Sequence, residues 1–147
     1  MKRNRLGPVV LALVVALLPG CGRPPIETES ESKAVKVEPI EGTDLNRVTV
    51  TAEAAKRLDL QMAPVRSIAL SGKTRKAIPY ASLVYDVSGN TWAYTSPESL
   101  TFVRMAVTVD YIEGDLAILT SGPPAGTQVV TVGVAELYGS ENEFEEE

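Results

Sequence analysis

Few side chains in this chain of 147 residues could carry out catalysis, and none of them is a histidine. Without histidine the chain lacks the usual general base, the common partner of a nucleophilic Ser or Cys, and the most frequent zinc ligand. Glu113 and Asp115 form a pair of carboxylates, but they flank Gly114, so a turn explains them without catalysis. The serines with nucleophilic potential have no base beside them in the sequence: Ser71, Ser82 and Ser121. We therefore expect a protein that is not an enzyme.

Residues that could hold a metal or a phosphate have simpler explanations. Met62 and Met105 could bind Cu(I) through their thioethers, but both fall in strand-like patterns where packing is expected. The C-terminal glutamates lack the turn glycine and preorganised oxygens of a Ca²⁺ site. The loop Gly122–Gly126 reads GPPAG, has no Lys-Ser/Thr after it and precedes a strand, unlike a phosphate-binding loop. We predict neither a metal site nor a cofactor.

The charge of the chain narrows the choice of partners. Its net charge is -5, and loss of a basic N-terminal segment would make it more negative. Nucleic acids require a basic surface, so we expect no nucleic-acid partner.

The N-terminus has the pattern of a secretory signal. Met1–Arg5 is basic, and Leu6–Leu18 is apolar apart from Gly7 and Pro8. As a helix this apolar run would span roughly 20 Å, less than the hydrocarbon core of about 30 Å. We therefore expect residues 1–20 to be a signal peptide rather than a permanent membrane span.

The residues that close this segment, Leu18-Pro19-Gly20-Cys21, resemble the lipobox of bacterial lipoproteins. In that family the cysteine is acylated and the chain is cut just before it. The resemblance implies that Cys21, the only cysteine, is the lipidation site and attaches the protein to a bacterial membrane on its extracytoplasmic side. The alternative is an ordinary signal peptide followed by an incidental cysteine.

Three further segments follow in the predicted organisation. Residues 21–45 are rich in Pro, Glu, Ser and Thr and predict a disordered tether. Residues 46–139 carry short β-rich runs separated by turn clusters and predict a small β domain. Residues 140–147 are mostly glutamate and predict an acidic tail.

The β domain should be mainly antiparallel, with about eight short strands and one short helix. Thr51 is a suitable N-cap for a helix over Ala52–Leu58. The turn at residues 86–90 predicts a hairpin that places Trp92 and Tyr94 on one face. Apolar residues alternate from Val103 to Val109, which predicts a strand. We expect a β-barrel-like half and a β-roll-like half.

The order of these segments resembles one family. IPYASLVYDVSGNTWAYT, FVRMAVTV and GDLAILTSGPPAGTQVVTVGVAEL follow one another as in the membrane-proximal end of periplasmic adaptor subunits, the membrane fusion proteins of RND-type efflux pumps. VTVTAEAAKRLDLQMAPV is similar to the preceding barrel segment, so the resemblance covers roughly residues 48–139. The lipoyl and helical-hairpin parts of a full adaptor have no counterpart in residues 22–44.

This resemblance implies a non-enzymatic accessory subunit of an efflux or export system, whose partners are an RND-type transporter and adaptor subunits. The expected contact residues are the exposed members of an aromatic and basic set, because such residues are enriched at interfaces: Tyr80, Tyr85, Trp92, Tyr94 and Arg104. Core and cross-strand packing is the alternative for each of them. Two other interpretations stay open: a lipoprotein that binds a small molecule or metal, and a degenerate adaptor fragment without a partner.

Overall fold

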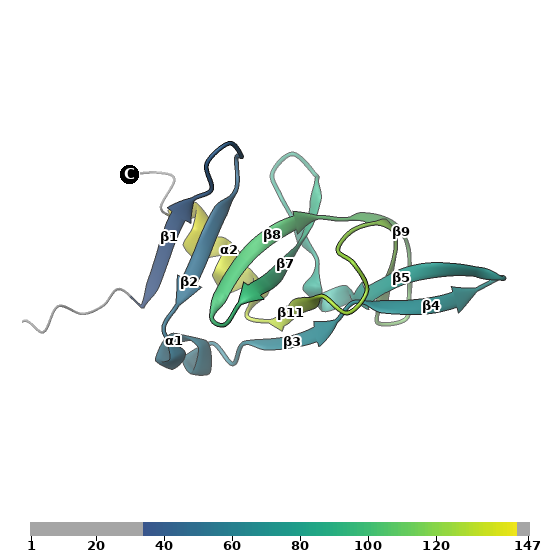
Figure 1. The fold of residues 1–147 in the computed structure, drawn as a ribbon, viewed down its shortest axis with the longest axis horizontal. Coiled ribbons are helices and arrows are strands. Elements are labelled where there is room, and N and C mark those ends of the chain that lie inside the picture. The colour runs from purple at the N-terminus through teal and green to yellow at the C-terminus, as the bar shows by residue number, and fades with distance from the viewer. Residues whose placement is uncertain (1–33, 144–147) are drawn as a thin grey trace, which may run out of the picture. The chain divides into compact units, whose positions relative to one another are not determined.

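Two antiparallel sheets make up most of the folded chain, so the predicted mainly-β class is confirmed. The computed structural model describes residues 34–143 (Figure 1). The predicted signal peptide and Cys21 lie outside these residues. Within them, no helix is long and apolar enough to cross a membrane.

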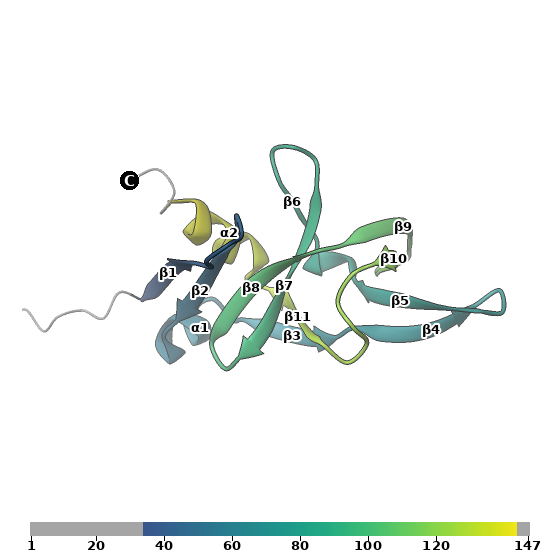
Figure 2. The same cartoon turned by 45° about the horizontal axis from the view of Figure 1, so that its top comes forward.

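The first sheet has the order β1-β2-β8-β7-β11-β3, with β6 paired to β7. Its strands are β1 (Val35–Pro39), β2 (Asn46–Val50), β3 (Gln61–Pro64), β6 (Val84–Tyr85), β7 (Thr91–Glu98), β8 (Thr101–Ala106) and β11 (Gln128–Val132). The second sheet has the order β4-β5-β10-β9 (Figure 2). Its strands are β4 (Arg66–Leu70), β5 (Lys73–Pro79), β9 (Thr108–Glu113) and β10 (Leu116–Ser121). The described part of the chain also contains three helical segments: α1 (Ala52–Arg57), the 3₁₀ turn η1 (Tyr80–Ser82) and α2 (Val134–Glu143).

The chain passes between the two sheets four times. It crosses at Val65, at η1, at Val107 and through residues 122–127. The apolar run predicted as one strand from Val103 is therefore divided at Val107, where β8 ends and β9 begins in the other sheet. A buried apolar cluster lies at these crossings and joins the sheets: Val65, Ile78, Ala93, Val107, Ala117, Leu119 and Val129.

A second buried cluster packs the first sheet against the helices. It contains Val48, Val50, Ala54, Val84, Tyr94, Phe102, Val130, Val134 and Leu137. Helix α2 lies against β1, β2 and β6 and covers this face of the sheet.

Helix α1 follows its local sequence signals. The Thr51 hydroxyl accepts a hydrogen bond from the Ala54 N–H at 3.1 Å, as an N-cap should. Glu53 lies in the first turn, and the last turn is basic, which suits the helix dipole. Ala54 is the buried helix residue, and the partly buried Ala55 packs against the same core.

The predicted tether, residues 21–45, is wrong for its described second half. Strand β1 pairs antiparallel with β2, placing Val37 opposite Val48. The Ile40 N–H donates to the Leu45 carbonyl at 2.9 Å and closes the connection between the two strands. The alternation of Val35 and Val37 with charged residues was hidden by the surrounding Pro and Glu, yet both valines pack on the core.

The predicted acidic tail, residues 140–147, is also wrong where the structure describes it. Residues 140–143 form the last turn of α2, and Glu141 is fully buried. A buried carboxylate requires a partner, and that partner, Arg104, lies on β8, far away in the sequence. Residues 34–143 thus contain eleven strands and two α-helices, where about eight strands and one short helix were expected.

Candidate functional site

The most exposed aromatic residues of the described chain gather around η1 and β6. Tyr80 is 49% exposed, Tyr85 is 55% exposed, and Val87 just beyond them is fully exposed. A groove of about 380 Å³ lies along the same segment. Apolar side chains from η1, β6 and α2 form most of its wall: Ala81, Leu83, Val84, Val134, Ala135 and Tyr138. We call Tyr80, Tyr85 and Val87 the aromatic surface, and the groove is a separate feature lined by other residues of this segment and by α2.

Backbone hydrogen bonds hold the η1 part of the aromatic surface in place. The Tyr80 N–H donates to the Asp115 carbonyl in the β9–β10 turn at 2.8 Å, and the Leu83 N–H donates to the Tyr80 carbonyl at 3.1 Å. Partial burial raises the pKa of the Tyr85 hydroxyl, and the neighbouring Tyr80 raises it further through its charge and a side-chain hydrogen bond. The two phenols are therefore neighbours on the surface.

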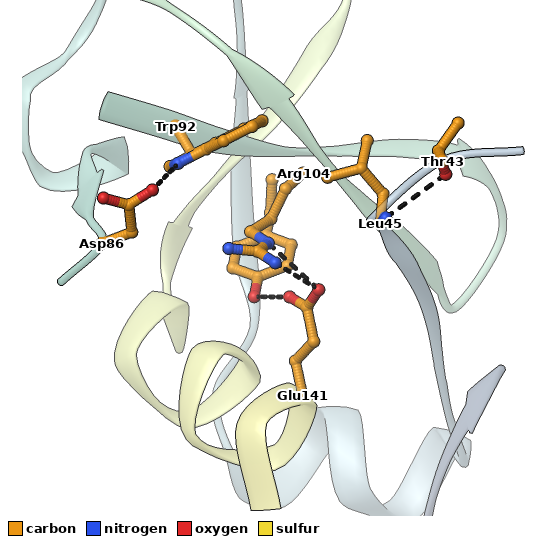
Figure 3. Close-up of polar contacts among 7 residues, drawn as sticks. Thr43, Leu45, Asp86, Trp92, Arg104 and Glu141 are labelled. Carbon is orange, nitrogen blue, oxygen red and sulfur yellow. Dashed lines mark hydrogen bonds and ion pairs between the residues drawn. The ribbon is translucent and has the colours of Figure 1, made fainter. Parts of the chain in front are cut away.

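The loop after β6 is organised by a single carboxylate. The Asp86 side chain accepts hydrogen bonds from the Ser88 N–H at 2.9 Å, and from the N–H and side-chain amide of Asn90 at 2.8 Å each. It also accepts from the Trp92 indole N–H at 3.0 Å (Figure 3). These bonds, led by the one from Trp92, lower the pKa of Asp86 to about 2. The loop is thus preorganised, with Val87 presented to solvent.

Tyr94 and Arg104 belong to the interior, so they are a wrong assignment as contact residues. Tyr94 has no exposed surface and Arg104 is only 8% exposed. They lie on neighbouring strands, β7 and β8, and face each other in register. Their side chains point at α2 because the sheet buries this face beneath the helix.

Glu141 of α2 binds both of these side chains. The Tyr94 hydroxyl donates to one carboxylate oxygen of Glu141, and the Arg104 Nε and Nη2 lie 3.0 Å from the other (Figure 3). The guanidinium also lies over the Trp92 ring at 5.2 Å and the Tyr138 ring at 5.6 Å. Burial, followed by the bond to Glu141, raises the pKa of the Tyr94 hydroxyl above its usual range. This group joins α2 to the sheet.

The residues expected to make contacts therefore fall into an exposed group and a buried group. Tyr80 and Tyr85 lie together on the aromatic surface, while Tyr94 and Arg104 form the buried attachment of α2. Trp92 is half-buried and connects the two regions, since its indole N–H binds Asp86 and its ring contacts Arg104.

Sequence reasoning missed Val87 and the groove wall supplied by α2. A valine within a turn is an unusual choice that could have indicated a functional surface. The apolar residues Val134 and Leu137, followed by Glu141, recur on one helix face, which was the available signal for α2.

The residues considered as possible metal ligands or catalytic groups either lie far from one another or have structural roles. Met62 on β3 and Met105 on β8 are separated by two strands of the first sheet. Glu113 and Asp115 flank the β9–β10 turn, where Gly114 has a φ of 58°. The Ser82 hydroxyl is buried without a hydrogen-bond partner. Among the described residues, no three Cys, Asp or Glu side chains gather as metal ligands would.

No family model, curated protein or solved structure matches this chain. The resemblance to periplasmic adaptor subunits therefore stays a prediction.

Proposed function

We propose that this protein is a lipid-anchored, non-enzymatic accessory subunit of a bacterial efflux or export system, and that it acts by binding another protein. In this proposal Cys21 carries the anchor and the aromatic surface binds an extracytoplasmic part of the transporter. The resemblance of residues 48–139 to adaptor subunits supports the choice of partner. It supports the location in the cell envelope as well.

The observation that carries the proposal is the rigid presentation of exposed apolar side chains. Asp86 fixes the loop through four hydrogen bonds, yet the loop leaves Val87 fully exposed beside two half-exposed tyrosines. Tyr is enriched among residues that dominate binding energy, and a preorganised loop loses little conformational freedom on binding. A partner protein that covers these side chains would remove apolar surface from water.

Site-specific photo-crosslinking in native membranes tests this proposal. A photoreactive phenylalanine analogue replaces Val87 or Tyr85 in the full chain, and the matched control carries it at Met62. Met62 is 47% exposed but lies on β3, away from η1 and β6. We expect the same transporter subunit to be captured from positions 87 and 85 and not from 62. Equal capture from all three positions, or capture of no transporter subunit, would contradict the proposal.

A second experiment concerns the anchor. Cys21→Ser should release the protein from the membrane fraction and reduce crosslinking from position 87, because the effective concentration at the transporter falls. Unchanged membrane association of this variant would contradict the role of Cys21, while leaving the aromatic surface as the proposed contact.

The groove is the candidate ligand site for the alternative function, binding of a small molecule. Its volume is within the range of small-molecule sites, about 300 to 1,000 Å³. A compound that raises the melting temperature of the full chain, but not of Ala135→Trp with its filled groove, would favour that alternative.

A further inference from the structure

The two outer strands of the second sheet carry opposite charges. Strands β4 and β5 form a hairpin over residues 66–79 that contains four basic residues and no acidic one: Arg66, Lys73, Arg75 and Lys76. Strands β9 and β10 form a hairpin over residues 108–121 with three acidic residues and no basic one: Asp110, Glu113 and Asp115. Within residues 34–143, β4 and β9 are the ends of this sheet and each has an unpaired edge.

These two edge strands contain no proline, unlike β1 and β3 of the first sheet. Strands β1 and β3, at the two ends of the main strand order of the first sheet, end in Pro39 and Pro64, and proline blocks pairing by another strand. Neither β4 nor β9 contains proline. Strand β9 also exposes two large apolar side chains, Tyr111 at 45% and Ile112 at 43%. An exposed strand edge with apolar side chains is a template for a further strand.

The register within the second sheet shows which side chains would meet. Tyr111 is opposite Ile118, Ile118 is opposite Ala77, and Ala77 is opposite Arg66, so these four residues share one face. Because side chains alternate along a strand, Ile68 lies on this face with Arg66, and Glu113 lies on it with Tyr111. The same face therefore has a basic and an apolar residue at one edge, and an acidic and an aromatic residue at the other.

We propose that a second copy of this chain is the partner, joined by antiparallel pairing of β4 in one copy with β9 in the next. In this arrangement Arg66 lies opposite Glu113, Ile68 opposite Tyr111, and Ser67 opposite Ile112. Both directly opposed pairs on the shared face are favourable cross-strand pairs. The contact uses Tyr111–Glu113, because the register of β9 shifts beyond Tyr111.

Strand direction is compatible with this contact. All neighbours in the second sheet are antiparallel, so β9 already runs opposite to β4 within one molecule. A second copy with its β9 antiparallel to β4 therefore keeps the orientation of the first copy. The contact is heterologous, since it joins two different edges, and it leaves a further edge free at each end.

Disulfide trapping in the full chain, purified in detergent with Cys21→Ser, tests this pairing. Ser67→Cys and Ile112→Cys are introduced together, and we expect a ladder of covalent oligomers on oxidation. Within one molecule β4 and β9 are three strand spacings apart, roughly 14 Å, so an internal disulfide is excluded. The control combines Ala69→Cys with Ile112→Cys, which shifts the register by two residues and separates the Cα atoms by roughly 8 Å.

Charge reversal supplies the second measurement. Arg66→Glu or Glu113→Arg alone should reduce the ladder by about threefold to tenfold, since each places like charges opposite one another. The two reversals together should restore it, because the pair is again of opposite sign. Both side chains are exposed, so the variants should keep their circular dichroism spectrum.

A ladder no stronger than that of the shifted control, or one that is insensitive to both reversals, would overturn the pairing. The second-sheet edges are separate from the aromatic surface, so this result would leave the proposed transporter contact unaffected.

Discussion

At the scale of single residues, Asp86 shows how one carboxylate can organise a loop. It accepts hydrogen bonds from Ser88, Asn90 and Trp92, and these bonds favour its ionised form. Its pKa in the folded protein is therefore lower than in the unfolded chain. Such a group stabilises the fold fully above its unfolded pKa of 3.8, and this contribution is lost as the pH falls toward its folded pKa of about 2.

Trp92 provides a direct measurement of this titration. It is the only tryptophan, so its indole N–H gives one unambiguous NMR signal. We expect the signal to shift with a midpoint near pH 2, and the shift to disappear in Asp86→Asn. A midpoint near pH 4 would show that the loop does not hold the carboxylate as described.

Glu141 is the residue whose burial depends most on other side chains. It is fully buried and paired with Arg104, so removing the arginine leaves a charge without compensation. We expect Arg104→Met to lower the free energy of unfolding by about 3 to 5 kcal/mol. The triple variant Tyr94→Phe, Arg104→Met and Glu141→Leu replaces all three side chains. It should lose much less free energy of unfolding than the sum of the losses of the three single variants. Urea denaturation measures each value, and additive losses would contradict a coupled group.

At the scale of elements, α2 depends on the glycine just before it. Gly133 has a φ of 84°, and a Cβ at this position would overlap a methyl group of Leu60. Gly126 has a similar φ of 88°, but a Cβ there would meet nothing within 4 Å. An alanine at Gly126 would therefore suffer backbone strain alone, whereas an alanine at Gly133 would suffer both backbone strain and a steric clash.

We expect Gly126→Ala to destabilise the protein by about 1 to 2 kcal/mol through backbone strain alone. Gly133→Ala should cost a further 1 to 3 kcal/mol, roughly, because Leu60 must move. Leu60→Ala in the Gly133→Ala background should cost less than Leu60→Ala alone. Thermal and urea unfolding of the four variants provide the comparison, and equal losses for the two glycines would contradict the close approach.

The elements also show what local sequence can predict. The helix α1 and the β6–β7 hairpin were predicted, because a capping threonine and the turn sequence Asp-Val-Ser-Gly-Asn act over a few residues. Strand β1 and the last turn of α2 were missed, because their composition is that of solvated chain. Val37 and Glu141 are recognised as core residues only from their partners in the folded structure. These partners are Val48 and Arg104.

At the scale of the whole molecule, the predicted class was right but the assembly of the strands was not predictable. The alternation from Val103 to Val109 is continuous in the sequence, and only the packing of Val107 between two sheets reveals the break. Pairing of β3 with β11 joins segments that are far apart along the chain. The groove likewise needs η1, β6 and α2 together, so Tyr80 and Tyr85 could be proposed from composition while the groove could not.

The four crossings between the sheets have a consequence for how the molecule opens. Neither sheet is a continuous stretch of chain, so separating one of them strains the connections to the other. We therefore expect the centres of both sheets to behave as one cooperative unit. In native-state hydrogen exchange, the amides of Phe102 in the first sheet and Ile118 in the second should have the same opening free energy. A clearly lower value for Ile118 would mean that the second sheet opens by itself.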